Sequence, residues 1–320
     1  MQQLAIKDDP ELELLLKVSK DYEDLFLGKR SGHLTEYIYC GDTDYYEKLV
    51  KEEKDYYLTS SEIKLLQKHK YEIANIIGKE CNVIEIGPGP EYILKTKVIP
   101  LLNAFKKLSS YTAIDINIDY ATQAAKFIRG EIKDLSCYSC KLDCVKELTR
   151  YYEEKNCLLF LGGTLGNFTD SEIKEVFSSF SKNLNKGEYL IFSLDCNEDL
   201  YSIEKAYKNS FVKHLVFNVV NHFKSCFMIK DFDPSKFKFK YEWNRIYNTV
   251  RLNLISTTAQ TFYFNEKKIV IPKNKKLYLV KSKKFKKEWI NNTLAQYGFT
   301  IVKNFEDDKK RILLYLAQKQ

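Results

Sequence analysis

The stretch that decides the fold is Val83-Ile84-Glu85-Ile86-Gly87-Pro88-Gly89, read together with Tyr111-Thr112-Ala113-Ile114-Asp115. Each apolar run is typical of a buried parallel strand, and the glycines allow a tight turn where the backbone can approach a ligand closely. Asp115 ends the second run, where its carboxylate can accept hydrogen bonds from a ribose diol. The pattern predicts a strand, turn, helix and strand that bind an adenosyl group.

The turn itself reads Gly87-Pro88-Gly89-Pro90-Glu91 and lacks a third glycine. A pyrophosphate-binding turn uses that glycine for close helix packing, so a nicotinamide dinucleotide is disfavoured. The form Glu-x-Gly-x-Gly suits S-adenosylmethionine (SAM), because that cofactor carries no phosphate. We expect Glu85 to anchor the turn and Asp143, at the next strand end, to accept the adenine amino group.

Strand and helix patterns alternate along the middle of the chain, which predicts a doubly wound, Rossmann-like α/β sheet. The expected strands are 82–86, 111–115, 136–141, 157–161 and 188–194, and the expected helices are 92–107, 119–130, 145–154 and 170–184. Upstream, we expect one or two short helices over 12–27 and another helix that opens at Ser60.

After Asp195 the pattern changes to a helix over 199–221 and short strand-like runs at 226–229, 250–256, 260–264, 268–271 and 277–281. A helix over 287–297 and a terminal hairpin then return to the α/β pattern. We therefore expect a SAM-binding core over 1–198, completed by 286–320, and an inserted, smaller α+β substrate domain over 199–285.

The composition favours a globular protein, with 44% hydrophobic residues in 320. The net charge of +8 comes from 51 basic and 43 acidic residues that are interleaved, which favours solvated faces over a nucleic-acid footprint. No signal-peptide pattern opens the chain, and no apolar run approaches the roughly 20 residues that cross a bilayer. We expect a cytoplasmic monomer without membrane or nucleic-acid partners.

Three of the eight cysteines form a cluster, Cys137, Cys140 and Cys144. A metal or redox role is one interpretation. No fourth ligand lies nearby in the sequence, which favours reduced, half-buried thiols and no metal site.

A second motif, Leu159-Phe160-Leu161-Gly162-Gly163-Thr164-Leu165-Gly166-Asn167-Phe168, delivers a strand into a glycine-rich loop. Doubly wound sheets bind ligands at this carboxyl edge, so we expect Gly162 beside the cofactor and Asn167 near the transferred methyl group. The carboxamide of Asn167 suits a zwitterionic head group. The alternative is an asparagine that caps its own turn.

These motifs, together with Tyr56-Tyr57-Leu58-Thr59-Ser60-Ser61-Glu62, resemble the histidine-specific SAM-dependent N-methyltransferase family. That family includes the Nα-methyltransferase of ergothioneine biosynthesis and fungal ergot-alkaloid N-methyltransferases. The resemblance extends over nearly the whole chain and implies a class I methyltransferase core with an inserted substrate domain, which methylates the α-amine of an amino acid. It implies that Gly87, Gly89, Asp115 and Asp143 bind the cofactor. The residues that it places around the acceptor are Tyr39, Tyr56, Tyr57, Asn167 and Tyr207, with Asn167 and Tyr207 on the carboxylate.

The resemblance also reveals a departure in the run Val280-Lys281-Ser282-Lys283-Lys284-Phe285. Family members that accept histidine carry Glu-x-Ser-x-Lys-Phe/Tyr here, with the glutamate and serine on the imidazole. Ser282 keeps the serine, but Val280 cannot accept a hydrogen bond. Losing a buried charged contact costs about 1.5–3 kcal/mol, which argues against histidine as the acceptor.

Methyl transfer from a sulfonium needs an in-line approach at about 3–3.5 Å and a neutral nitrogen lone pair. We therefore predict catalysis by positioning, with Tyr57, Asn167 and Tyr207 orienting the amine of an amino acid or a derived small molecule. One alternative is a protein, peptide or RNA methyltransferase, for which the lysines would supply contacts. Another is a SAM-binding protein that has lost its activity, with Val280 as one sign of drift.

Overall fold

The computed structural model describes residues 10–29, 32, 34–40, 44–78, 80–142 and 155–320. The described residues form two compact units. The larger unit comprises those within Glu47–Tyr207 and Lys283–Gln320, and the smaller unit those within Met1–Tyr46 and Lys208–Ser282. None of the described helices is long and apolar enough to span a membrane.

The larger unit is built on a sheet of seven strands among the described residues, in the order β11-β12-β5-β4-β1-β2-β3. The strands β1, β2, β3, β4 and β5 run parallel, whereas β12 is antiparallel to β5 and β11 to β12. Their bounds are β1 (Cys81–Ile86), β2 (Leu108–Asp115), β3 (Ser136–Lys141), β4 (Asn156–Phe160), β5 (Tyr189–Asp195), β11 (Phe299–Glu306) and β12 (Ile312–Lys319). The carboxyl ends of the parallel strands consequently meet at one edge, and the order in which the chain adds strands to the sheet reverses between β1 and β4.

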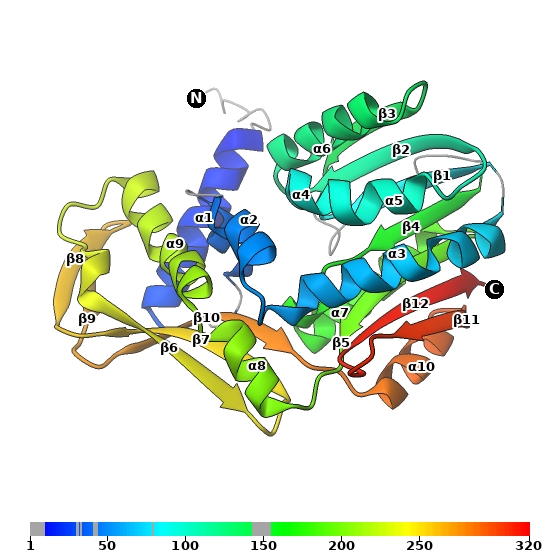
Figure 1. Cartoon of the computed structure of the whole chain (residues 1–320). Coiled ribbons are helices and arrows are strands. Elements are labelled where there is room, and N and C mark those ends of the chain that lie inside the picture. Colours follow the sequence, from blue (N-terminus) through cyan, green and yellow to red (C-terminus); the bar gives the residue numbers. More distant parts are fainter. Residues whose placement is uncertain (1–9, 30–31, 33, 41–43, 79, 143–154) are drawn as a thin grey trace, which may run out of the picture. The chain divides into compact units, whose positions relative to one another are not determined.

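Helices cover both faces of this sheet (Figure 1). One face carries α3 (Tyr57–Ile77), α4 (Glu91–Ile93), the π-turn η2 (Leu94–Val98), α5 (Ile99–Leu102) and α6 (Ile118–Glu131). The other carries α7 (Asp170–Asn183) and α10 (Lys287–Gln296), whose Phe177, Phe180 and Ile290 join a buried core with Leu158 and Phe192. The unit also contains the short η3 (Thr164–Asn167) and α8 (Leu200–Tyr207), while α2 (Asp44–Glu52) spans the division between the units. These findings confirm the α/β Rossmann-like fold predicted from the sequence.

The helix that follows the glycine turn contains Pro100 in its last segment, α5. A proline has no N–H and its ring displaces the carbonyl four residues earlier, here that of Thr96. The backbone widens into the π-turn η2 at this point, and Gln67 Nε2 of α3 donates to the Thr96 carbonyl at 2.9 Å. The helix predicted over 92–107 is thus present as the consecutive segments α4, η2 and α5, and it ends at Leu102 rather than near residue 107.

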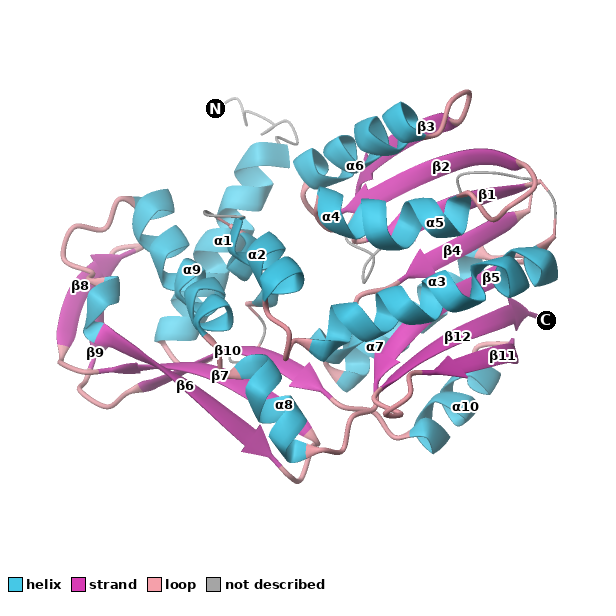
Figure 2. Cartoon of the chain, in the orientation of Figure 1, coloured by secondary structure: helices cyan, strands magenta, loops and turns pink. Residues whose placement is uncertain are grey.

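The smaller unit combines helices with a three-stranded sheet, β10-β7-β6, and a two-stranded ribbon, β8-β9, among its described residues (Figure 2). Its elements are α1 (Pro10–Phe26), η1 (Thr35–Tyr39), α9 (Ser210–Phe227), η4 (Pro234–Lys236), β6 (Phe237–Asn244), β7 (Thr249–Ser256), β8 (Gln260–Phe264), β9 (Lys267–Ile271) and β10 (Lys276–Lys283). Aromatic rings pack α1 against α9. The ring centroid of Phe223 on α9 lies 5.0 Å from that of Tyr22 and 4.7 Å from that of Phe26, both on α1. This packing groups the described residues before Tyr46 with the insertion, whereas the sequence pattern assigned them to the core.

Three helix boundaries differ from the sequence predictions. The helix expected over 199–221 divides into α8 and α9, because Asn209 caps a new helix by accepting from the Val212 N–H at 2.9 Å. The run 226–229, predicted as a strand, begins inside α9, since so short an apolar run cannot be told from a buried helix end. The helix predicted to open at Ser60 begins at Tyr57, and Ser60 Oγ donates back to the Tyr57 carbonyl.

Candidate active site

The glycine turn follows β1 at the carboxyl edge of the sheet. Gly87 and Gly89 have φ angles of +69° and +75°, a region that glycine adopts without steric cost. The Gly87 N–H donates to the Ile114 carbonyl of β2 at 2.8 Å, which fixes the turn. A Cβ atom added at Gly87 would meet no heavy atom within 4 Å, so the turn borders open space that a ligand can fill.

Asp115 ends β2 beside this turn. Its Oδ1 accepts the backbone N–H of Asn117 at 2.9 Å, and its side chain is half-buried. Burial raises the pKa of the Asp115 carboxyl to about 6, and backbone N–H groups oppose the shift. An ionised carboxylate in this position retains lone pairs that a diol could reach.

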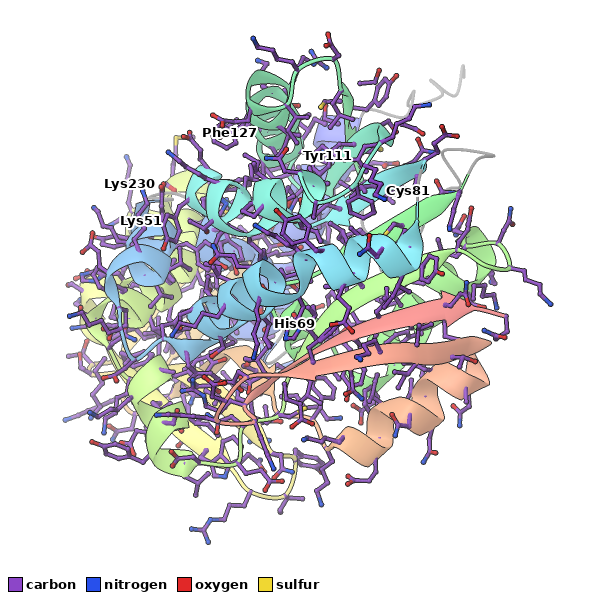
Figure 3. The ribbon with its side chains drawn as sticks, turned by 45° about the vertical axis from the view of Figure 1, so that its right-hand side comes forward. Lys51, His69, Cys81, Tyr111, Phe127 and Lys230 are labelled. Carbon is purple, nitrogen blue, oxygen red and sulfur yellow. The ribbon has the colours of Figure 1, made fainter. Side chains whose placement is uncertain are left out.

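Glu85 lies inside the sheet, with only 1% of its side chain exposed. Tyr111, which extends from β2 (Figure 3), donates its hydroxyl to Glu85 Oε2 at 2.6 Å. Burial raises the pKa of Glu85 to about 7, and Lys97 opposes that shift. Within the described residues Glu85 Oε1 has no hydrogen-bond partner. This carboxyl therefore lies enclosed under the turn.

A buried ion pair holds the neighbouring glycine loop. Lys97 Nζ lies 2.9 Å from Glu62 Oε2, and the two side chains are 4% and 2% exposed. The other oxygen of Glu62 accepts the Gly162 N–H at 2.7 Å and the Ser193 hydroxyl. Gly162 has a φ of +84°, so the glycine is required by the turn. The N–H of Gly162 is thus used within the protein, and Glu62 links α3, η2, the β4 loop and β5.

Asn167 ends η3 in the same loop. Its side chain is half-buried and has no hydrogen-bond partner among the described residues. Backbone hydrogen bonds close the turn: the Gly166 N–H donates to the Gly163 carbonyl, and the Phe168 N–H donates to the Leu165 carbonyl. The carboxamide is therefore not a cap for its own turn, and it is available to a ligand at the carboxyl edge.

Beside this loop, Asp195 at the end of β5 joins two tyrosines that the sequence had singled out. Asp195 Oδ2 lies 2.8 Å from the Tyr57 hydroxyl and 2.7 Å from Lys284 Nζ, and Lys284 Nζ donates to the Tyr207 hydroxyl at 2.9 Å. Burial, reinforced by Asp195, raises the pKa of Tyr57 well above its usual value, so this hydroxyl keeps its proton. Tyr57 and Tyr207 are 2% and 6% exposed. Tyr56 is half-buried, and its ring stands edge-on to that of Tyr207 at 6.2 Å.

The remaining predicted acceptor residues belong to the smaller unit. Tyr39 ends η1, and its ring meets that of Tyr46 edge-on at 5.1 Å. Val280 and Ser282 lie two residues apart on β10, so they share one face of the strand, and they are 4% and 8% exposed.

Two other predictions concern residues 143–154, which lie outside the described part of the chain. Asp143 and Cys144 fall there, as does the helix expected over 145–154. Of the other cluster cysteines, Cys137 is buried and Cys140 half-buried. Among the described residues no group of three or more histidine, cysteine, aspartate or glutamate side chains could hold a metal ion.

Four residues of this site escaped the sequence analysis: Glu62, Lys97, Asp195 and Lys284. Glu62 looks like a capping residue and Lys284 like part of a solvated lysine run. Both are nearly fully buried, and buried charges must be paired. The one available signal was position, since Asp195 ends a buried strand at the ligand-binding edge.

Comparison with known sequences decides the family. The profile described as "Histidine-specific methyltransferase, SAM-dependent" matches residues 40–319. The chain belongs to this family. SAM is accordingly its cofactor, and the open glycine turn and Asp115 carboxylate fit an adenosyl group.

Individual relatives are distant. Ergothioneine biosynthesis protein 1 of Neurospora crassa is 27% identical over 162 residues, which cover 49% of this chain and 18% of that protein. The histidine N-alpha-methyltransferase of Mycolicibacterium smegmatis is 26% identical over 215 residues, 64% of each chain. The match therefore spans less than two thirds of either relative. A SAM-dependent methyltransferase of Clostridium acetobutylicum shares the fold, with a TM-score of 0.51, 12% identity and coverage of 87% of this chain and 97% of that one.

Proposed function

We propose that this family member is an N-methyltransferase that acts on the amine of an amino acid or of a small molecule derived from one. One observation carries the proposal. The carboxamide of Asn167 follows β4, and the buried Tyr57–Asp195–Lys284–Tyr207 network lies at the end of the neighbouring strand β5. The match to the histidine-specific family supports an amino-acid acceptor. Val280 argues that this acceptor is not histidine.

The carboxyl ends of β1 and β2 support a place for the cofactor. Gly87 and Gly89 would let the backbone approach SAM, and Asp115 would accept hydrogen bonds from its ribose diol. SAM supplies an electrophilic methyl group on a sulfonium. The protein's task is then to orient a neutral amine in line with that group and to exclude water.

The acceptor's carboxylate would meet the amide N–H₂ of Asn167, which can donate two hydrogen bonds. Tyr56 is half-buried and would border the amine. Tyr57 and Tyr207 are buried, so we assign them positioning roles beneath this surface. The Tyr57 hydroxyl donates to Asp195, and the Tyr207 hydroxyl accepts from Lys284.

Replacing Asn167 with alanine tests the proposal directly. Losing a hydrogen bond to a charged group costs about 1.5–3 kcal/mol, so kcat/KM for an amino-acid acceptor should fall about 10- to 150-fold. SAM affinity, measured by calorimetry, should stay unchanged. Asn185→Ala, an exposed asparagine in the turn before β5, is the matched control and should keep full activity. Unchanged turnover in Asn167→Ala, or cofactor binding without methylation of any small amine, would contradict the proposed function.

SAM affinity should depend on pH through Asp115. Its pKa of about 6 lies above the usual range, so the free protein takes up a proton here as the pH falls through 6. A protonated carboxyl accepts poorly, and the SAM dissociation constant should therefore rise up to about tenfold per unit below pH 6 and level off above pH 7. Calorimetry of the wild type and of Asp115→Asn checks this, because the variant should lose the slope. Any slope that persists in the variant would point to Glu85, which titrates near pH 7.

A further inference from the structure

An arginine of the larger unit lies against one of the tyrosines that we assign to the acceptor site. Arg311 directly precedes β12, and its guanidinium stands over the ring of Tyr57, 4.8 Å from the centroid. The hydroxyl of the same ring donates to Asp195 at 2.8 Å. A cation over an aromatic face is attracted by the quadrupole of the ring, most strongly where water is excluded. Tyr57 is 2% exposed and the side chain of Arg311 is 18% exposed, so this contact is largely shielded from solvent.

The guanidinium is held in place by Asp307, which lies in the turn between β11 and β12. Arg311 Nε and Nη2 donate to Asp307 Oδ2 at 3.1 and 3.0 Å. The other carboxylate oxygen accepts the backbone N–H groups of Arg311 and Ile312. Burial opposes the charged form of Asp307, but these N–H groups and the guanidinium outweigh it and lower the pKa of this carboxyl. Asp307 therefore stays ionised at neutral pH, and it sets the orientation of the guanidinium.

Ser61 ties this ion pair to the helix that carries Tyr57. The helix α3 packs along β12 (Figure 1), and Ser61 follows Tyr57 on α3 by one turn, so both side chains lie on one face. The Ser61 hydroxyl donates to Asp307 Oδ2 at 3.0 Å and accepts from Arg311 Nη2 at 3.1 Å. The first turn of α3 is thus bound to the turn between β11 and β12 through both Tyr57 and Ser61.

The Tyr57 side chain is consequently restrained at two places. Asp195 at the end of β5 holds its hydroxyl, and Arg311 covers one face of its ring. Both restraints come from neighbouring strand ends, because Ile312, the residue after Arg311, pairs with Asp195 in the register of β12 and β5. A single hydrogen bond leaves a phenol able to swing about its side-chain torsions, whereas a guanidinium on the ring face opposes that motion. Methyl transfer depends on such restraint, since a misplacement of 1 Å can cost about 100-fold in rate.

We propose that Arg311 is a positioning residue for methyl transfer, which holds the Tyr57 hydroxyl on Asp195 and thereby fixes the surface that orients the acceptor's amine. This inference rests on the proposed function, because it assumes that Tyr57 lies beneath the acceptor. Arg311 acts through Tyr57, and Asp307 and Ser61 orient its guanidinium. The alternative is an arginine that only fastens the β11–β12 turn to α3, and the two roles predict different kinetics.

Kinetics at saturating SAM, with an amino-acid acceptor that the wild type methylates, test this role. Arg311→Met removes the charge and the hydrogen bonds, so kcat/KM for the acceptor should fall about 10- to 100-fold while calorimetry shows native SAM affinity. Arg311→Lys keeps the charge but not the planar fork, and it should recover part of the loss. Lys309→Met is the matched control, because Lys309 is exposed and lines the same cavity as Arg311, and it should keep full activity.

A double-mutant cycle separates positioning from fastening. Tyr57→Phe removes the hydroxyl that Arg311 is proposed to hold. In that background Arg311→Met should lower kcat/KM by less than about threefold more, because no hydroxyl is left to position. An arginine with only a structural role would multiply the two losses in full. Melting temperatures confirm that each variant is folded, and Arg311→Lys replaces Arg311→Met in the cycle if the methionine variant does not fold.

The outcomes distinguish this inference from the function on which it rests. Native kcat/KM in Arg311→Met, or full multiplication of the two losses in the cycle, would overturn the role of Arg311 and leave the proposed function in place. A wild type that binds SAM but methylates no amino acid or derived amine would reject the proposed function, and this inference with it.

Discussion

Replacing Lys97 with methionine should lower the free energy of unfolding by about 3–5 kcal/mol, because it leaves Glu62 charged and buried without its cation. Methionine preserves most of the lysine stem, so the lost charge dominates the effect. The pair is among the most enclosed in the larger unit, at 4% and 2% exposure. Urea denaturation followed by circular dichroism measures the change.

A double variant separates charge from packing. Glu62→Gln combined with Lys97→Met removes both charges, and glutamine can still accept from Gly162 and Ser193 through its carbonyl. It should recover a substantial part of the lost stability. The exposed pair Lys107–Glu80, 2.6 Å apart with side chains 66% and 61% exposed, supplies the control, and Lys107→Met should cost less than about 1 kcal/mol. Equal losses in Lys97→Met and Lys107→Met would rule out a special cost of burial.

Replacing Asp115 with alanine should raise the SAM dissociation constant at least about 100-fold at pH 7.5. A ribose diol can donate two hydrogen bonds to this carboxylate, and each such bond to a charged group contributes about 1.5–3 kcal/mol. The loss should appear in cofactor affinity while the fold stays intact. Asp115 is half-buried, and the hydrogen bond that its side chain accepts from the Asn117 N–H stabilises only the local turn.

Asp119 in the first turn of α6 provides a matched control, because it is exposed and only four residues away. Asp119→Ala should bind SAM as the wild type does. Asp115→Asn should fall between the wild type and alanine, since an amide keeps one acceptor oxygen. If Asp115→Ala bound SAM with native affinity, the cofactor would have to be held elsewhere, and the assignment of the β2 end would fail.

The sequence was most informative where local pattern and burial coincide. The runs that became β1 and β2 are apolar because both faces of a central parallel strand are covered, so their ends and the position of Asp115 could be predicted. Asn167 was placed in the same way, since a glycine-rich loop after a buried strand must emerge at the carboxyl edge. The alternating residues Phe237-Lys238-Phe239-Lys240-Tyr241 also carry a strand period, and β6 could have been predicted from them.

Long-range pairing was beyond the reach of local patterns. Lys284 sits among lysines in the sequence and only its partner Asp195, 89 residues away in the chain, makes it a buried residue. Pro100 is visible in the sequence, but the hydrogen bond that Gln67 donates from another helix to the Thr96 carbonyl is not.

The contact between Asp195 and Lys284 also bears on how much the segment between these two residues can vary. Asp195 is where the chain leaves the core sheet and Lys284 is where it returns, and a backbone bond from the Phe285 N–H to the Asp195 carbonyl at 2.8 Å reinforces the junction. The core thus closes the loop itself, and lengthening a closed loop adds only about 0.6 kcal/mol per doubling. The segment between Asp195 and Lys284 could therefore change greatly in length at little cost to the stability of the core sheet.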